Sequence, residues 1–231
     1  MSAAPSAPRA GRHTGVLGGS FNPIHYGHLL LADDVREALA LDRIIFVPAA
    51  APPHKPAGQL APAADRFAMV ERAIATHPAF AASDIELRRT GPSFTVDTLE
   101  ALRSPGEELY LVVGSETFLD LLSWREPRRV ASLARLVVVP RTGSPFDAEA
   151  APAQKVLREI GATGFSVARP GEGRSTVAAR DVLIVHAMSL PISASDIRRR
   201  VREGRSLAYR LPDAVRDYIR AHGLYRQERA S

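Results

Sequence analysis

The sequence contains no cysteine and only one tryptophan. A chain without cysteine forms no disulfide, has no thiolate nucleophile and holds no metal through sulfur. It also lacks any apolar run near the ~20 residues that a membrane-spanning helix needs. Its opening residues, rich in Ala, Pro, Ser and Arg, lack the apolar middle of a secretory signal. These absences favour a cytoplasmic protein, and we expect residues 1–13 to form a disordered tail.

Length and composition indicate one globular domain. The 231 residues are 45% hydrophobic and 24% charged, which is ordinary for a folded α/β protein with a buried core. The formal charge is +5, from 30 basic and 25 acidic residues, and the arginines are scattered. A mild positive field suits anionic nucleotides as well as nucleic acid, so charge alone does not choose between them. We place the single domain at residues 14–226.

One stretch near the start organises the chain. The apolar run Thr14 to Leu17 leads into Gly18 and Gly19, then into a proline turn, and helical periodicity follows from Leu29 to Leu39. This order predicts a strand, a loop and a helix. Adjacent glycines let a ligand approach the backbone, and the helix start offers free N–H groups and a positive dipole end. The pattern is typical of a phosphate site.

Two histidines stand at the start of that helix. His25 and His28 are three residues apart and therefore share one face, with Gly27 keeping that face uncrowded. An isolated pair of this kind is often a surface or capping feature, because histidine is adaptable. Zinc is a weaker interpretation, since no further ligands stand at metal spacing. With glycines before the pair and a helix after it, phosphate contact is the leading hypothesis.

A second candidate phosphate site lies near the end of the chain. Ser193 and Ser195 stand at a predicted helix start, and Arg198 follows one turn later. Hydroxyls, free N–H groups and a guanidinium all favour a polyphosphate. The alternative is an ordinary serine cap followed by arginines on a solvated face.

The remaining periodicity alternates between strands and helices, which predicts a Rossmann-like, doubly wound parallel sheet that binds ligands along its carboxyl edge. We expect Ser93 to cap the helix at 96–102. The expected strands are 43–48, 80–87, 109–114, 135–141 and 182–185, and the expected helices are 65–75, 96–102, 115–124, 154–160 and 211–219.

Gly18 to His28 resembles the Gly-Gly-x-Phe-(Asp/Asn)-Pro-x-His-x-Gly-His signature of the nucleotidyltransferase superfamily. Within that superfamily the chain most resembles the bacterial nicotinate-nucleotide adenylyltransferases. Ile192 to Arg198 resembles the family's Ile-Ser-x-(Ser/Thr)-x-Ile-Arg motif, and Gly223 to Tyr225 resembles its Gly-Leu-Tyr ending. The resemblance extends from Thr14 to Tyr225.

The resemblance implies transfer of the adenylyl group of ATP to nicotinate mononucleotide, giving deamido-NAD and pyrophosphate. It makes His25, His28 and Arg198 the catalytic residues. It implies Mg²⁺ held mainly by ATP and pyrophosphate oxygens and by water, without a dedicated protein site. It implies an ATP site formed by Gly18, Gly19, Ser20, Phe21, His25, His28, Ser193, Ser195, Ile197 and Arg198.

The resemblance also implies a mononucleotide site, which departs from the family at two positions. Phe94 replaces the commoner tyrosine, and Glu116 stands where aspartate is usual. From the residues alone, Lys55 is by default a solvated surface lysine, and a lone tryptophan such as Trp124 is more often a core residue than a ligand contact. The implied mononucleotide site comprises Asn22, Lys55, Phe94, Thr95, Glu116, Trp124 and Arg141.

Other functions stay open at this stage. One alternative is an adenylyltransferase that uses nicotinamide mononucleotide, or both mononucleotides. Another is an adenylyltransferase for phosphopantetheine, although such enzymes are generally shorter and lack the segment that contains Phe94 and the tryptophan at position 124. A non-catalytic nucleotide-binding regulator of the same fold is the alternative from another class. The expected partners are the two substrates, without nucleic acid or membrane, and a homo-oligomer is left open.

Overall fold

The computed structural model describes residues 11–52, 60–140, 146–170, 178 and 180–226. Lys55 and Arg141 therefore lie outside the described residues, as does the tail up to residue 10. The strands are β1 (Arg12–Gly19), β2 (Arg43–Pro48), β3 (Phe80–Ala82), β4 (Glu107–Gly114), β5 (Arg135–Val139), β6 (Phe165–Ala168) and β7 (Val182–Val185).

Helices connect most of these strands. Within the described ranges, each helix is too short or too polar to cross a membrane. The helices are α1 (Tyr26–Ala38), α2 (Ala63–Ile74), α3 (Thr95–Leu102), α4 (Ser115–Leu119), the 3-10 turn η1 (Leu121–Ser123), α5 (Pro127–Leu133), α6 (Ala151–Ile160), α7 (Ala194–Arg202) and α8 (Asp213–Ala221).

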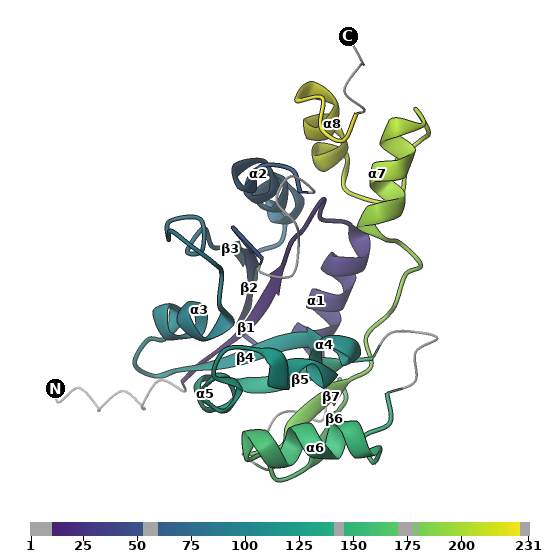
Figure 1. Ribbon diagram of the computed structural model, residues 1–231. Helices are drawn as coiled ribbons and strands as arrows, with labels where there is room; N and C mark the ends of the chain where they lie inside the picture. The colour runs from purple at the N-terminus through teal and green to yellow at the C-terminus, as the bar shows by residue number, and fades with distance from the viewer. Residues whose placement is uncertain (1–10, 53–59, 141–145, 171–177, 179, 227–231) are drawn as a thin grey trace, which may run out of the picture.

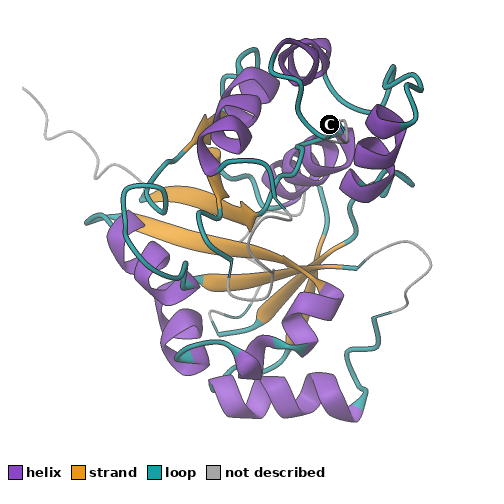
Figure 2. Ribbon diagram, turned by 45° about the horizontal axis from the view of Figure 1, so that its top comes forward, coloured by secondary structure: helices purple, strands orange, loops and turns teal. Residues whose placement is uncertain are grey.

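The strands form one parallel sheet in the order β3-β2-β1-β4-β5-β7-β6. Helices cover both faces, as Figures 1 and 2 show, and the predicted doubly wound fold is confirmed. Alternate strand residues enter opposite cores because side chains alternate across a strand. Leu17, Phe46 and Val112 face the core under α1, α2 and α8, whereas their neighbours Val16 and Ile45 face the core under α3, α5 and α6.

The order of the strands places an open crevice beside β1. The chain leaves β1 toward β2, but it leaves β4 toward β5, in the opposite direction across the sheet. Such a switch in direction leaves space beyond the carboxyl ends of the two central strands, and ligands of open α/β sheets bind there. Gly19 ends β1 and Gly114 ends β4, so both strands end in glycine at this crevice.

Several predicted boundaries differ from the structure: the helix expected at 154–160 begins at Ala151, the helix expected at 211–219 spans Asp213–Ala221, and the strand expected at 135–141 ends at Val139. The strand expected at 80–87 ends at Ala82, since Asp84 turns the chain by accepting from the N–H of Arg88 through its carbonyl. The helix expected at 115–124 is divided into α4 and η1. β1 begins at Arg12, so this strand includes two residues that were assigned to the tail.

Two elements had no counterpart in the sequence prediction. Helix α5 follows Glu126, whose backbone is left-handed with φ 53°. Strand β6 pairs only with β7, at the edge of the sheet, where burial is partial and the hydrophobic pattern is weak. Both elements depend on packing against neighbours that are distant in the sequence, which local periodicity does not report.

A polar cluster ties the amino ends of the central strands. Glu107 accepts hydrogen bonds from the Thr14 hydroxyl and from Arg43 Nη2, the latter at 2.7 Å. Burial raises the pKa of Glu107, but these hydrogen bonds outweigh burial and hold that pKa below its ordinary value of 4.5. The ionised carboxylate therefore stabilises the fold.

We predict that Glu107→Gln lowers the free energy of unfolding at pH 7 by about 1–3 kcal/mol, as expected for a buried charged hydrogen bond. Because the folded pKa lies below the unfolded value, this stabilisation is present above pH 4.5 and is lost as pH falls through the folded value. Urea unfolding from pH 3 to 8 measures it. Equal stability of wild type and variant at pH 7 would contradict the assignment.

Candidate active site

The connection from β1 to α1 is held in shape by close packing around Phe21. The Phe21 backbone has φ 42°, and its ring lies edge-on to the ring of His28, with centroids 5.2 Å apart. A Cβ added at Gly19 would lie 3.1 Å from Phe21 Cζ. Only glycine at position 19 therefore lets this ring pack beneath the loop without displacement.

The two histidines stack at the start of α1. Their ring centroids lie 3.8 Å apart with an interplanar angle of 22°. The backbone N–H of His25 donates to Nδ1 of His28 at 3.3 Å. Because Nδ1 of His28 accepts, the proton of its neutral ring is assigned to Nε2, which makes Nε2 a hydrogen-bond donor.

His25 lies deeper than His28. Its side chain is 6% exposed, and its Nδ1 has no hydrogen-bond partner among the described residues. A Cβ added at Gly27 would lie 3.1 Å from that nitrogen, so the ring needs a glycine beside it. Burial lowers the pKa of His25 to about 4. The imidazole is therefore neutral at pH 7.

We predict an NMR titration midpoint near 4 for His25 in the unliganded protein. The folded pKa lies below the ordinary value of 6.5, so the unfolded chain takes up a proton at this position before the folded protein does. The free energy of unfolding is therefore highest above pH 6.5 and falls as the pH is lowered from 6.5 to 4. This pKa shift corresponds to about 3 kcal/mol of free energy of unfolding. Because His25→Asn removes the titrating group, we expect the variant to lose less stability than the wild type between pH 6.5 and pH 4. A midpoint between pH 6 and 7 would contradict the burial of the ring.

Asn22 connects this loop to the second motif. Its main-chain carbonyl accepts a hydrogen bond from Arg198 Nη1 at 2.8 Å, although 176 residues separate the two in sequence. Figure 1 shows α7 beside the end of α1 that follows β1. The structure therefore brings Arg198 to the loop that carries the histidine pair.

The first turn of α7 decides in part between the two interpretations of its serines, a helix cap and a phosphate site. Ser193 caps the helix by accepting from the N–H of Asp196 at 3.2 Å, and its hydroxyl lies 3.0 Å from that of Ser195. Both serines are exposed, so capping leaves them accessible to a ligand. Ile197 differs from the expectation, because its side chain is fully buried in the core and its N–H donates to the Ser193 carbonyl.

Sequence reasoning missed two residues that support the loop. Arg66 of α2 is 1% exposed and donates to three main-chain carbonyls, including that of Ser20 at 2.8 Å. Tyr225 donates its hydroxyl hydrogen bond to Asn22 Oδ1 at 2.9 Å. A signal for Arg66 was present, because position 66 falls on the apolar stripe that contains Met69 and Val70.

Two of the residues expected at the mononucleotide, Phe94 and Trp124, lie on the face of the sheet that α3 and α5 cover, whereas Asn22 lies in the loop after β1. Phe94 and Trp124 are half-buried and pack against the same core, the one beneath α3 and α5. Thr95 begins α3, and the Arg125 guanidinium lies 4.9 Å from the centroid of the Phe94 ring. The structure therefore places both aromatic rings at one core margin.

Ser93 is not the helix cap that we expected. The cap position is Phe94, and the Ser93 hydroxyl instead accepts from the N–H of Ala51 at 3.3 Å. The N–H of Ser93 donates to the Ala51 carbonyl at 3.2 Å. This pair of hydrogen bonds fastens the segment after β2 to the start of α3.

Glu116 stands in the first turn of α4, directly beyond the end of β4. It is exposed, whereas the preceding Ser115 is 3% exposed. The Ser115 hydroxyl has no hydrogen-bond partner in the part of the chain that the structure describes. The crevice beyond β4 thus has a carboxylate at its surface and an unpaired hydroxyl below it.

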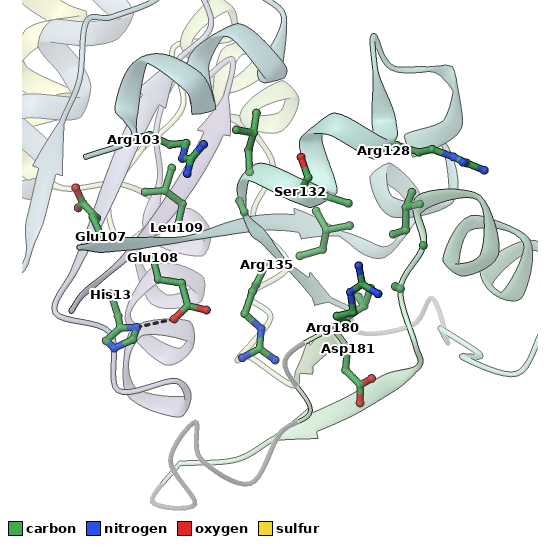
Figure 3. A pocket seen from close by; sticks show the side chains of 18 of the residues that line it. His13, Arg103, Glu107, Glu108, Leu109, Arg128, Ser132, Arg135, Arg180 and Asp181 are labelled. Atoms are coloured by element: carbon green, nitrogen blue, oxygen red, sulfur yellow. Dashed lines mark ion pairs between the residues drawn. The ribbon is translucent and has the colours of Figure 1, made fainter. Parts of the chain in front are cut away.

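A cavity of about 650 Å³ lies at the opposite edge of the sheet, by the amino ends of β4, β5 and β7 (Figure 3). Its charged side chains have both signs, and the ion pair between His13 and Glu108 measures 3.2 Å. None of the predicted site residues lines it. This cavity is therefore distinct from the histidine site.

No group of three or more His, Asp or Glu side chains able to hold a metal occurs among the residues that the structure describes. The rings of His25 and His28 stack on each other, and the His25 N–H donates to His28 Nδ1.

A parallel sheet with a histidine pair at its crevice and an arginine brought to the same loop defines a nucleotidyltransferase of the cytidylyltransferase-like class. The family model described as "Cytidylyltransferase-like" matches residues 16–200. The chain belongs to this class and, within it, to the nicotinate-nucleotide adenylyltransferase family, as its relatives show.

Two relatives named "Probable nicotinate-nucleotide adenylyltransferase" illustrate the match. The one from Roseiflexus sp. (strain RS-1) is 43% identical over 213 residues, covering 92% of this chain and 97% of the relative. The one from Syntrophotalea carbinolica is 42% identical over 219 residues, covering 94% and 99%. The resemblance inferred from the motifs is thereby confirmed.

Solved structures share the fold. The chain superposes with TM-score 0.67 on the Plasmodium falciparum nicotinic acid mononucleotide adenylyltransferase complexed with NaAD, at 19% identity, with 93% of this chain and 97% of that chain covered. The same enzyme complexed with APC gives a TM-score of 0.65. At this identity the likeness establishes the architecture alone.

Proposed function

We propose that this protein transfers the adenylyl group of ATP to nicotinate mononucleotide, producing deamido-NAD and pyrophosphate. The observation that carries the proposal is the stacked pair His25 and His28 at the start of α1, which Arg198 joins through the Asn22 carbonyl. The names of the closely similar relatives support this substrate pair over others.

The reaction needs no general base. A phosphate monoester has its second pKa near ~6, so the mononucleotide phosphate is already largely a dianion at neutral pH. One of its oxygens attacks the α-phosphorus of ATP, the new P–O bond forms, and the bond between the α-phosphorus and the bridging oxygen breaks. The task left to the protein is to align the groups and stabilise the developing charge.

The site residues divide this task by position. His28 donates from Nε2 to the phosphate chain, while neutral His25 backs it by stacking at 3.8 Å. Arg198 and the exposed hydroxyls of Ser193 and Ser195 face the β- and γ-phosphates, as suits a guanidinium and a free helix start. When bound, Mg²⁺ would be held mainly by phosphate oxygens and water and would neutralise charge on the departing pyrophosphate.

The mononucleotide occupies the margin beside α3 and η1 in this proposal. Trp124 and Phe94 provide an aromatic surface for the pyridine ring, and the N–H groups at Thr95 receive the nicotinate carboxylate. Asn22 and Glu116 contact the nucleotide from the two central loops. Lys55 and Arg141, which lie outside the described residues, complete the proposed set as phosphate contacts.

Pyrophosphate release from ATP and Mg²⁺ tests the substrate assignment. We expect release with nicotinate mononucleotide at least about 10-fold faster than with nicotinamide mononucleotide, since the amide lacks the charge that the N–H groups receive. Equal rates would indicate a dual-specificity pocket. Binding of ATP without release from either mononucleotide would replace the proposal with a regulator.

We predict that His28→Ala reduces kcat about 10²- to 10³-fold and changes KM for ATP less than about threefold, because its donor acts on charge that develops in the transition state. His77→Ala, just before β3, removes an imidazole that stacks on Phe80 and pairs with Asp33 in the middle of α1, and it serves as the control. Equal losses in kcat and in substrate affinity would contradict a transition-state role.

A further inference from the structure

The guanidinium of Arg66 holds two loops together from beneath. Its Nη1 donates to the Ser20 carbonyl at 2.8 Å, Nε donates to Ala61 at 2.9 Å, and Nη2 donates to Ala50 at 3.3 Å. Ser20 follows β1, whereas Ala50 and Ala61 flank the segment between β2 and α2. One side chain therefore fixes the backbone at the carboxyl ends of two neighbouring strands.

The burial of this cation is unfavourable for stability. Arg66 is 1% exposed, and burial lowers its pKa more strongly than the nearby Tyr225 and Glu86 groups raise it. Moving a cation from water into a protein interior costs several kcal/mol unless it is well paired. Met69 and Val70 fill the same stripe of α2 with apolar side chains. Packing alone does not require arginine at position 66.

Asn22 is fixed from three directions. Its Oδ1 accepts from the Ala61 N–H at 3.0 Å and from the Tyr225 hydroxyl at 2.9 Å, and its main-chain carbonyl accepts from Arg198 at 2.8 Å. Burial raises the pKa of Tyr225, so its hydroxyl keeps the proton that it donates. Asn22 is consequently the point where the histidine loop, α7 and the end of the chain meet.

The packing of α8 places Tyr225 beside Asn22. Helix α8 docks on α2, where the Tyr218 hydroxyl donates to Asp65 at 2.7 Å and Arg72 lies 4.4 Å from the Tyr218 ring centroid. The chain then turns back through the N–H of Leu224, which donates to Ile219 at 3.0 Å. Tyr225 reaches a residue that precedes it by 203 positions.

We propose that Arg66 and Tyr225 are positioning residues for adenylyl transfer. Together they fix the Ser20 carbonyl and the Asn22 side chain, which sets the direction of the loop that carries His25 and His28 and the placement of Arg198. Arg66 also contributes a positive charge, partly offset by Glu86, behind a loop that receives phosphates in the proposed reaction. The inference rests on the proposed function, and neither residue contacts substrate.

The matched variants Tyr225→Phe and Tyr218→Phe separate positioning from stability. Each removes one part-buried, hydrogen-bonded hydroxyl from the C-terminal region, but of these two hydroxyls only that of Tyr225 is bonded to the loop. For Tyr225→Phe we expect kcat to fall about 3- to 10-fold with KM for ATP changed less than about twofold, the range of one hydrogen bond. For Tyr218→Phe we expect a lower Tm and unchanged kcat. Unchanged kcat in Tyr225→Phe would overturn the proposal.

Arg66→Lys tests geometry against charge. Lysine keeps the positive charge but cannot span three carbonyls, because its single ammonium lacks the planar fork of arginine. We expect kcat to fall at least about 10-fold in Arg66→Lys, with the variant folded by circular dichroism. Full activity in this variant would overturn the role of Arg66. Should it not fold, the Tyr225→Phe comparison still decides the role of Tyr225.

Hydrogen exchange of the amides at 20–22 provides a readout that needs no turnover. We expect Tyr225→Phe to speed exchange there about 3- to 10-fold, whereas Tyr218→Phe leaves it unchanged. Wild-type protein that releases no pyrophosphate would overturn the proposed function while the exchange result still tests the fixed loop. Unchanged exchange in Tyr225→Phe would overturn the positioning role even in a fully active enzyme.

Discussion

The hydrogen bonds that converge on residues 20–22 are the constraint on which the site depends. The sheet brings β1 to the switch point, but the three residues after it have no regular structure to hold them. Arg66 takes the Ser20 carbonyl, and Asn22 is bonded to Ala61, Arg198 and Tyr225. The geometry of the histidine pair follows from these bonds, because α1 begins only four residues after Asn22.

Several buried polar groups lower the stability of the fold near the edge of the sheet where we propose that ATP binds. His25 is buried with an unpaired Nδ1, Arg66 is a buried cation, and Ser115 has a buried hydroxyl without a partner in the described chain. Each is unfavourable in the empty protein. In the proposed reaction, phosphates supply negative charge to this edge, so the groups that destabilise the empty fold favour the loaded one. The rest of the sheet, packed on both faces, compensates for the loss.

The sequence predicted those features that residues close together in the chain determine. Short apolar runs identified the central strands, and the glycine turn located the histidine loop. The structure gives Ser193 the capping role that the sequence had offered as one alternative. The support of the loop was not predictable in this way, since Tyr225 and Arg198 reach Asn22 across 203 and 176 residues. Arg66 was read as part of a simple amphipathic helix, although a charged residue on an apolar stripe indicates a buried polar contact.

The two departures from the family pattern fall on one side of the site. Phe94 lacks the hydroxyl of the commoner tyrosine, and one face of its ring lies under Arg125, which is 3.8 Å from Asp97. Glu116 is exposed in the first turn of α4, so its extra methylene needs no space in the core. The phosphate side, from Gly18 to His28, keeps the full motif. Under the proposed function, variation at Phe94 and Glu116 would act on recognition of the mononucleotide, while the residues proposed to align the phosphates are constrained by their shared contacts at Asn22.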